Sequence, residues 1–361
     1  MLQDGVCEAT PMSPFGQSLA AAANESERPA PWTALRPQAA REPRTRAPLV
    51  VVLAGGEGRR IRLFTTLRDG VVVPKQFCRF RDQRTLLATT LDRALRLAPA
   101  QQVLAVVLES HREWWEPELR RLPAANVLSQ PASRGTGVAI LHALARIDHS
   151  DRSPNVVVMP SDHDFEDEGA VLLAIARAAR AARRHPEDLV LLGIAPTHLD
   201  PEYGLIVPGP GTPAHGLRVL AFVEKPTLTT AAQLARSGAL WNSFIFAGTG
   251  DALYAAFEDA AASVARAYVR GIGAVAREPA WLVELFDGLP DCDFCRDVLQ
   301  RCANRLRLIS VPPCGWTDLG TPARLASWLD RHREAAFWQN SGRVRGTNDP
   351  GPAGDWHARS A

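Results

Sequence analysis

The sequence predicts an α/β protein with a mixed, mostly parallel central sheet flanked by helices. Two observations predict it. Short, wholly apolar runs rich in β-branched residues recur along the chain, which is typical of strands buried on both faces. Segments with helical periodicity separate the first four of these runs. Strands that alternate with helices favour a layered α/β architecture.

The expected elements follow in chain order. The predicted strands are 49–53, 103–108, 156–159, 189–194, 217–223 and 306–311, and the predicted helices are 86–97, 138–147 and 170–184. The first strand runs into Ala54-Gly55-Gly56, which indicates a tight loop. In parallel sheets ligands lie outside the carboxyl ends of the strands. The residues that follow each apolar run are therefore the first candidates for a site.

Composition and charge limit the kind of ligand. The chain has 361 residues, of which 46% are apolar and 22% charged, and its net charge is +2. This profile is typical of a globular protein with a large core. A balance so close to neutrality gives no general attraction for nucleic acid or a membrane surface, so we expect a small anionic ligand.

The two ends differ in composition from the middle. Residues 1–46 lack periodic apolar positions and are expected to form a disordered leader, and residues 334–361 a disordered tail. The catalytic domain is expected at 47–333. The sequence has neither a secretory signal pattern nor an apolar stretch of membrane-spanning length, so we expect a cytoplasmic protein.

Six cysteines are scattered along the chain, and Cys292 and Cys295 form a CxxC pair. A zinc ribbon needs a second pair, or a histidine pair at the right distance, and none follows. We therefore expect partly buried thiols at the start of a helix, in preference to a metal or redox site.

Lysine is rare in this chain. Only two of the forty-one basic residues are lysines, Lys75 and Lys225, and each lies in a short motif, Pro-Lys-Gln-Phe and Val-Glu-Lys-Pro. Arginine presents a planar fork, whereas lysine presents a compact point charge. Two lysines kept in an arginine-rich chain indicate a phosphate-binding site.

The loop from Gly55 to Arg60, Gly-Gly-Glu-Gly-Arg-Arg, has glycines where a backbone must turn sharply and approach a phosphate closely. It lacks the third glycine of the dinucleotide fingerprint and the Gly-Lys-Ser/Thr ending of a P-loop, so both of those interpretations fail. Arg60 and Lys75 are two cations that could clamp a triphosphate whose leaving group is pyrophosphate.

Two aspartates are candidate ligands of Mg²⁺. Asp162 directly follows a buried strand, and Asp318 lies in a turn after Trp316. Mg²⁺ usually takes one or two protein carboxylates together with phosphate oxygens and waters, so two converging aspartates would suffice. The neighbouring His163 is expected to satisfy a hydrogen bond in the core.

Eight motifs occur in an order that resembles the sugar-1-phosphate nucleotidyltransferases, and most closely the mannose-1-phosphate guanylyltransferases. They are Gly55-Gly56-Glu57-Gly58-Arg59-Arg60, Pro74-Lys75-Gln76-Phe77, Gln130-Pro131 with Arg134-Gly135-Thr136, Pro160-Ser161-Asp162-His163, Tyr203-Gly204, Val223-Glu224-Lys225-Pro226, Trp241-Asn242-Ser243 and Gly315-Trp316-Thr317-Asp318-Leu319-Gly320. The resemblance covers residues 48 to 330. It implies a Rossmann-like fold of the glycosyltransferase-A type.

The resemblance also implies an activity: transfer of a nucleotidyl group from GTP to mannose-1-phosphate, which yields GDP-mannose and pyrophosphate with Mg²⁺ as cofactor. It implies roles for individual residues. The implied roles are catalysis for Arg60, Lys75 and Asp162; nucleotide binding for Ala54, Gly55, Gly56, Gly58, Gln130, Gly135 and Thr136; sugar-phosphate binding for Gly204, Glu224, Lys225 and Asn242; and metal binding for Asp162 and Asp318.

The sequence departs from the family pattern in several places. Arg59 stands where relatives carry a small residue, where it either crowds the loop or adds a phosphate contact. The stretch 61–73 is about four residues longer than usual, and Phe244 replaces a glycine. These changes leave open another hexose-1-phosphate, another nucleotide, or a non-catalytic sugar-nucleotide sensor. We expect no appended cupin domain and no hexapeptide repeats, and a homodimer is left open.

Overall fold

The computed structural model describes residues 47–332, apart from 81–83, 147–153, 214 and 275–278. The expected leader (1–46) and tail (334–361) lie outside the described residues. None of the described helices combines the length and the hydropathy that crossing a membrane requires.

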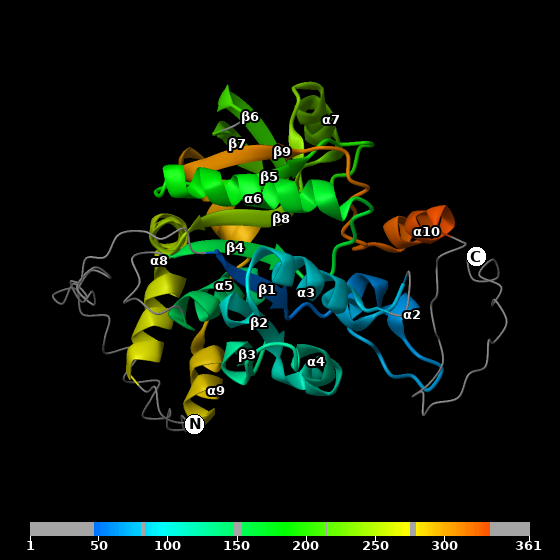
Figure 1. The fold of residues 1–361 in the computed structure, drawn as a ribbon, viewed down its shortest axis with the longest axis vertical. Helices are drawn as coiled ribbons and strands as arrows, with labels where there is room; N and C mark the ends of the chain where they lie inside the picture. Colours follow the sequence, from blue (N-terminus) through cyan, green and yellow to red (C-terminus); the bar gives the residue numbers. More distant parts are fainter. Residues whose placement is uncertain (1–46, 81–83, 147–153, 214, 275–278, 333–361) are drawn as a thin grey trace, which may run out of the picture. The chain divides into compact units, whose positions relative to one another are not determined.

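In the part of the chain that the structure describes, nine strands form one sheet in the order β3-β2-β1-β4-β8-β5-β9-β7-β6 (Figure 1). The strands are β1 Leu49–Ala54, β2 Val103–Leu108, β3 Val127–Gln130, β4 Asn155–Pro160, β5 Leu189–Ile194, β6 Leu205–Thr212, β7 Gly216–Val223, β8 Leu240–Thr249 and β9 Leu306–Val311. The pairings give seven strands one direction and give β7 and β8 the other. The predicted mixed, mostly parallel sheet is confirmed.

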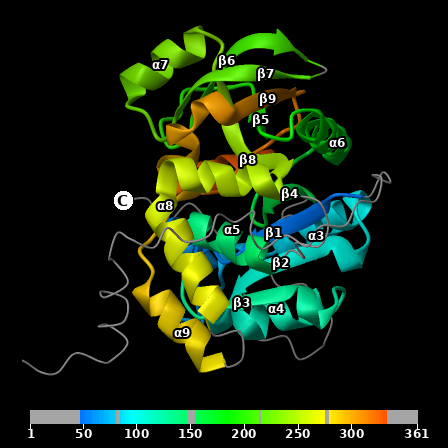
Figure 2. The same cartoon turned by 90° about the vertical axis from the view of Figure 1, so that its left-hand side faces the viewer.

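The helices of the described residues are α2 Arg62–Thr65, α3 Leu86–Leu97, α4 Arg112–Leu119, α5 Gly135–Arg146, α6 Glu168–Arg184, α7 Leu228–Arg236, α8 Gly250–Ala274, α9 Pro279–Gly288 and α10 Pro322–Arg331. Several of them cover the two faces of the sheet. Helices α3 and α6 pack against each other on one face, and α5 and α8 on the other (Figures 1 and 2). The predicted strands and helices are all present.

Local sequence explains where the main elements begin. The run of β1 buries its central valines on both faces, as a central parallel strand requires. Thr85, Asp167 and Thr321 cap α3, α6 and α10, because each side chain accepts a hydrogen bond from a backbone N–H three residues on. Strands β3, β6 and β8 were not predicted. β3 is only four residues long, and β6 contains two prolines, which are normally confined to edge strands.

The carboxyl ends of β1, β2, β3, β4 and β5 meet at one edge of the sheet, because these strands share a direction. Strand β7 reaches this region by a different route. It pairs antiparallel with β9 and forms a hairpin with β6, which places Val223 opposite Leu205 and Leu205 opposite Trp241. Glu224 therefore follows β7 into the same region.

Candidate active site

The glycine loop after β1 is fastened to the segment that carries Lys75. Gly58 has a left-handed φ of 61°, and a Cβ at this position would lie 3.0 Å from the Cβ of Lys75. The Gln76 side chain donates hydrogen bonds to the carbonyl oxygens of Ala54 (2.9 Å) and Gly56 (3.0 Å). A larger residue at position 58 would therefore both strain the backbone and separate the loop from Lys75.

Lys75 joins the two predicted metal-binding aspartates. Its side chain is only 5% exposed, and Nζ lies 2.9 Å from Oδ2 of Asp162. The same Nζ donates to the backbone carbonyl oxygen of Asp318. Burial alone raises the pKa of each carboxyl group, but the Lys75 ammonium reverses this and holds both pKa values below the usual range. Both aspartates are therefore ionised at neutral pH.

The donor set fits a divalent cation. Among the described residues, no hydrogen bond reaches Oδ1 of Asp162, whose side chain is 30% exposed; His163 Nε2 lies 3.8 Å from this oxygen. The charge of Asp318 partly opposes the lowering of the Asp162 pKa by Lys75, so the two carboxylates lie within electrostatic reach of each other. Two ionised carboxylates held beside the same lysine side chain suit Mg²⁺, which prefers hard oxygen ligands.

Arg60 lies at the mouth of this cluster and is exposed. Its guanidinium pairs with Glu202 at 2.8 Å, and a Cβ at Gly320 would lie 3.0 Å from its Nη2. The neighbouring Arg59 does not crowd the loop, because its side chain is 76% exposed and pairs with Glu57. A phosphate at this place would compete with Glu202 for Arg60.

On the predicted base side, Gln130 ends β3 and is 2% exposed. Its Oε1 lies beside Gly55, where a Cβ would be 3.5 Å away, and its Nε2 has no hydrogen-bond partner among the described residues. A buried donor without a partner costs about 1–3 kcal/mol. An acceptor atom on a bound ligand would remove this cost.

Gly135 and Thr136 lie against the segment that carries Cys292 and Phe294. Gly135 has a φ of 83°, and a Cβ there would lie 2.3 Å from the Cys292 carbonyl oxygen. The Thr136 hydroxyl accepts a hydrogen bond from the backbone N–H of Phe294 at 2.9 Å. The Thr136 hydroxyl is thus already used in a tertiary contact, and a ligand contact would have to share it.

The predicted sugar-phosphate residues meet at the start of β6. A Cβ at Gly204 would lie 2.6 Å from Oε2 of Glu224 and 3.6 Å from the Cβ of Asn242. Asn242 is 8% exposed, and its amide donates to the Cys295 sulfur at 3.3 Å. Lys225 is exposed and, among the described residues, makes no hydrogen bond or ion pair. Its ammonium is therefore available to a ligand.

Glu224 has an unusual acidity. Burial raises the pKa of its carboxyl group to about 7, the nearby Asp293 charge adds to this, and the Lys225 ammonium opposes it. Near neutral pH the group therefore exchanges between a hydrogen-bond donor and an acceptor-only carboxylate.

Three aromatic rings pack together beside Gly204, Asn242 and the Asp318 turn. Tyr203 packs against Trp241 and Trp316 with ring centroids 4.9 and 4.8 Å apart, and all three are buried. Such tilted pairs add about 0.5–1.5 kcal/mol beyond the area they bury. They hold the start of β6 against the Asp318 turn.

Three non-glycine residues in the described part of the chain have positive φ angles: Lys225 (45°), Phe244 (59°) and Leu319 (47°). Each lies in one of the motifs singled out in the sequence or directly after one. Such conformations cost about 1–3 kcal/mol and cluster at functional sites. The left-handed backbone at Phe244 also explains why a glycine is typical of this position.

The remaining predictions concern His163 and the CxxC pair. Trp316 Nε1 donates to His163 Nδ1 at 3.2 Å, and burial lowers the His163 pKa to about 4, so the ring is neutral and hydrogen-bonded as expected. Cys292 and Cys295 are free and buried. Burial raises the pKa of Cys292 to about 11 and that of Cys295 well above its usual value, so both thiols stay protonated and poorly suited to metal.

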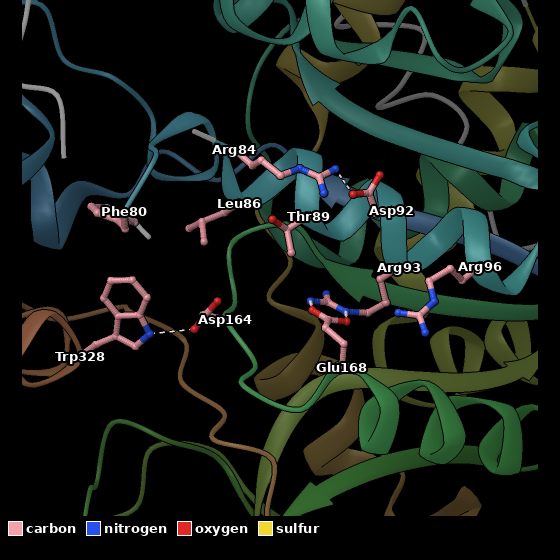
Figure 3. Close-up of a pocket in the computed structure, with 10 residues that line it drawn as sticks. All are labelled: Phe80, Arg84, Leu86, Thr89, Asp92, Arg93, Arg96, Asp164, Glu168 and Trp328. Atoms are coloured by element: carbon pink, nitrogen blue, oxygen red, sulfur yellow. Dashed lines mark hydrogen bonds and ion pairs between the residues drawn. The ribbon is translucent and has the colours of Figure 1, made fainter. Parts of the chain in front are cut away.

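A pocket of about 240 Å³ opens between α3, the start of α6 and α10 (Figure 3). It contains none of the predicted site residues. Its charges are largely paired with one another: Arg93 binds Glu168, Arg84 binds Asp92, and Trp328 donates to Asp164 at 2.7 Å. Asp164 lies two residues after Asp162, so the bond from Trp328 supports the turn that carries Asp162.

Sequence reasoning missed two residues that shape the site. Gln76 stood inside the Pro-Lys-Gln-Phe motif, and an amide beside a glycine loop was the available signal. Arg324 binds the Asp318 carboxylate at 2.8 and 2.9 Å. It gave no signal, because in an arginine-rich chain an arginine near the start of a helix looks like a surface charge.

Comparison with known proteins supplies the context for this geometry. The profile of the nucleotidyl transferase family matches residues 49–333. The xanthan biosynthesis protein XanB of Xanthomonas campestris pv. campestris is 36% identical over 55% of this chain and 41% of its own length. Mannose-1-phosphate guanylyltransferase of Escherichia coli K12 is 31% identical over 75% of this chain and 57% of its own length.

The chain thus spans about half the length of these curated relatives. Among solved structures, a Thermus thermophilus protein described as a mannose-1-phosphate geranyltransferase superposes with a TM-score of 0.66 at 29% identity, over 75% of this chain and 76% of that one. With the family profile covering nearly all of the described residues, the chain belongs to the nucleotidyl transferase family.

Proposed function

We propose that this protein transfers a nucleotidyl group from GTP to mannose-1-phosphate, giving GDP-mannose and pyrophosphate. The observation that carries the proposal is the convergence of Lys75, Asp162 and Asp318 beside the glycine loop. This buried cation and these two ionised carboxylates support binding of a triphosphate and a metal ion at this place. The name of the Escherichia coli relative, a mannose-1-phosphate guanylyltransferase, supports mannose-1-phosphate and GTP as the substrate pair, and the name of the Thermus thermophilus structure supports mannose-1-phosphate alone.

The reaction needs no covalent enzyme intermediate. A phosphate oxygen of the sugar-1-phosphate forms a bond to the α-phosphorus of the nucleotide. The bond from that phosphorus to the α,β-bridging oxygen breaks, and pyrophosphate leaves with the electron pair. The nucleophile is already an anion, so the task of the protein is positioning and charge neutralisation.

The residues of the chain divide this task. The backbone of Gly55 to Gly58 and the cations Arg60 and Lys75 would hold the triphosphate and stabilise the charge of the leaving pyrophosphate. Gln130, whose Nε2 has no partner within the described part of the chain, would donate to an acceptor on the base, next to Gly135 and Thr136. Glu224 and Asn242 would bind sugar hydroxyls beside Gly204, and Lys225 would bind the attacking phosphate.

Asp162 and Asp318 would hold Mg²⁺. The bound ion would supply Lewis-acid stabilisation of the phosphate oxygens. Lys75 keeps both carboxylates ionised without it. A cytoplasmic location and a homodimer remain predictions from the sequence.

The test is pyrophosphate release from a panel of nucleoside triphosphates against hexose-1-phosphates, each with and without Mg²⁺. The proposal expects the highest kcat/KM for GTP with mannose-1-phosphate and loss of activity when EDTA is added. Higher kcat/KM with another pair would correct the substrates and keep the reaction. Tight binding of GDP-mannose with no release from any pair would show a non-catalytic sensor and contradict the proposal.

A further inference from the structure

Arg324 is a buried cation that holds the carboxylate of Asp318. It lies near the start of α10, and only 7% of its side chain is exposed. Its Nη1 donates to Oδ1 and Oδ2 of Asp318 at 2.8 and 2.9 Å, and its Nε donates to Asp200 at 2.8 Å. The guanidinium also stacks over the Tyr203 ring at 3.7 Å. Arg324 is therefore fixed on three sides.

The bonds to Asp318 leave little of its carboxylate free. Oδ1 also accepts from the Tyr203 hydroxyl at 3.1 Å and from the Gly320 N–H at 2.8 Å. Among the described residues, Oδ2 accepts only from Arg324. Asp318 therefore presents one oxygen to a cation, in a fixed orientation, and shares that oxygen with Arg324.

The charge of the cluster also indicates that Arg324 weakens its attraction for a cation. The connected cluster holds the cations Lys75 and Arg324 and the carboxylates of Asp162, Asp318 and Asp200, so its formal charge is −1. Without Arg324 the charge would be −2, and the Asp318 carboxylate would regain its free lone pairs. A partly buried cluster screens such a change only weakly.

We propose that Arg324 is a positioning residue that orients Asp318 and also competes with the divalent cation for it, so that the free enzyme holds metal weakly. The inference rests on the proposed function, because that function gives Asp318 its metal. It has an unusual consequence. Loss of an ordinary supporting residue weakens metal binding by about 10–100-fold, whereas loss of Arg324 should strengthen it.

The test is a titration of the full chain with Mn²⁺ in the absence of substrates. The electron paramagnetic resonance signal of free Mn²⁺ measures how much of the metal is bound. Arg324→Gln should lower the Mn²⁺ Kd about tenfold while kcat for pyrophosphate release falls about 10–100-fold. Arg324→Lys keeps the charge but loses the planar fork, so its Kd should stay within about twofold of the parent while kcat still falls.

Arg331→Gln is the matched control, because Arg331 lies on the same helix, is 55% exposed and only approaches Glu166 at 4.0 Å. Neither its Kd nor its kcat should change. Thermal melts identify the folded variants. If Arg324→Gln does not fold, the Mn²⁺ Kd of Arg324→Lys is the test. A Kd of Arg324→Lys more than fivefold above that of the parent overturns the proposal. A folded Arg324→Gln with unchanged or weaker Mn²⁺ binding overturns it as well.

The Mn²⁺ titration also separates the two proposals. If the parent protein releases no pyrophosphate from any substrate pair, the proposed function fails, whereas tighter Mn²⁺ binding in Arg324→Gln would still support competition for Asp318. The reverse result, an active parent with no gain in Mn²⁺ affinity, would remove only the role of Arg324.

Discussion

The two lysines of this chain lie in opposite environments. Lys75 is buried, and its ammonium is enclosed between Asp162 and the Asp318 carbonyl oxygen. Lys225 is exposed, makes no ion pair among the described residues and has a left-handed backbone. One end of the site is thus built before any ligand arrives, whereas the other keeps its charge for a ligand.

The difference indicates how the two ends divide the work. A cation with fixed partners is pre-organised for the charge that develops on a leaving group, and it costs no reorganisation during the reaction. A solvated cation on a flexible stem gains its partner only on binding. The end that contains Lys75, the inner end, should therefore control kcat. The end that contains Lys225, the outer end, should control the KM for the sugar phosphate.

The largest effect is expected for Lys75→Ala. The variant should lose at least about 10³-fold in kcat/KM, because the charge of the leaving group loses its buried cation. It should also melt at a lower temperature, since the Asp162 carboxylate would lose the buried cation that pairs with it. Pyrophosphate release and a thermal melt measure the two effects. Full magnesium-dependent turnover in this variant would refute the role of the inner end.

Asp162→Asn should also lower pyrophosphate release about 10³-fold while the fold stays intact. The amide keeps the size of the side chain, and the side chain is 30% exposed, so little packing is lost. Asp259→Asn is the control, because this exposed aspartate on α8 forms its ion pair with Arg305, away from the site. Equal losses in both variants would mean that the assay reports a general effect and not the site.

Lys225→Ala should raise the KM for the sugar phosphate by about 10–100-fold, since a hydrogen bond to a charged group contributes about 1.5–3 kcal/mol. The melting temperature should not change, because the side chain is exposed. Steady-state kinetics with varied sugar phosphate measure this. A fall in kcat at unchanged KM would contradict the proposal that Lys225 controls the KM for the sugar phosphate.

Glu224→Gln tests the raised pKa at the outer end. A carboxyl group whose folded pKa is about 7, above its ordinary 4.5, contributes stability below pH 4.5 that is lost as the pH rises to 7. The glutamine variant should therefore be more stable than the parent at pH 8, by roughly 2 kcal/mol after allowance for partial exposure, and nearly equal at pH 4.5. Urea unfolding at both pH values measures the difference, and a variant that gains nothing at pH 8 would contradict the raised pKa.

The smallest effect isolates backbone strain at Phe244. Phe244→Ala and Phe244→Gly both lose the ring contacts with Phe246 and Phe294, whose centroids lie 6.4 Å away. Only glycine relieves the positive φ, so Phe244→Gly should be more stable than Phe244→Ala by about 1 kcal/mol. Urea unfolding of the two variants measures this difference. Equal free energies of unfolding would show that position 244 carries no strain.

Much of the fold could be predicted because its signals are local. The apolar runs of β1, β2, β4, β5, β7 and β9 and the periodicity of α3, α5 and α6 appear within single windows of sequence. The two-proline β6 and the mixed β8 carry no such signal. The direction of β7 could not be predicted either, because it depends on a hairpin partner that sequence reasoning had not found.

By itself the sequence determined the α/β class and the placement of polar motifs at strand ends, since hydrophobic periodicity and turn residues act over short distances. Only the tertiary structure decided that Lys75 reaches the carbonyl of a residue 243 positions away, that the Phe294 N–H binds the Thr136 hydroxyl, and that Arg324 holds Asp318. Such contacts depend on how whole layers pack against one another. No local pattern of residues encodes that arrangement, because burial and charge pairing are settled between segments far apart in the chain.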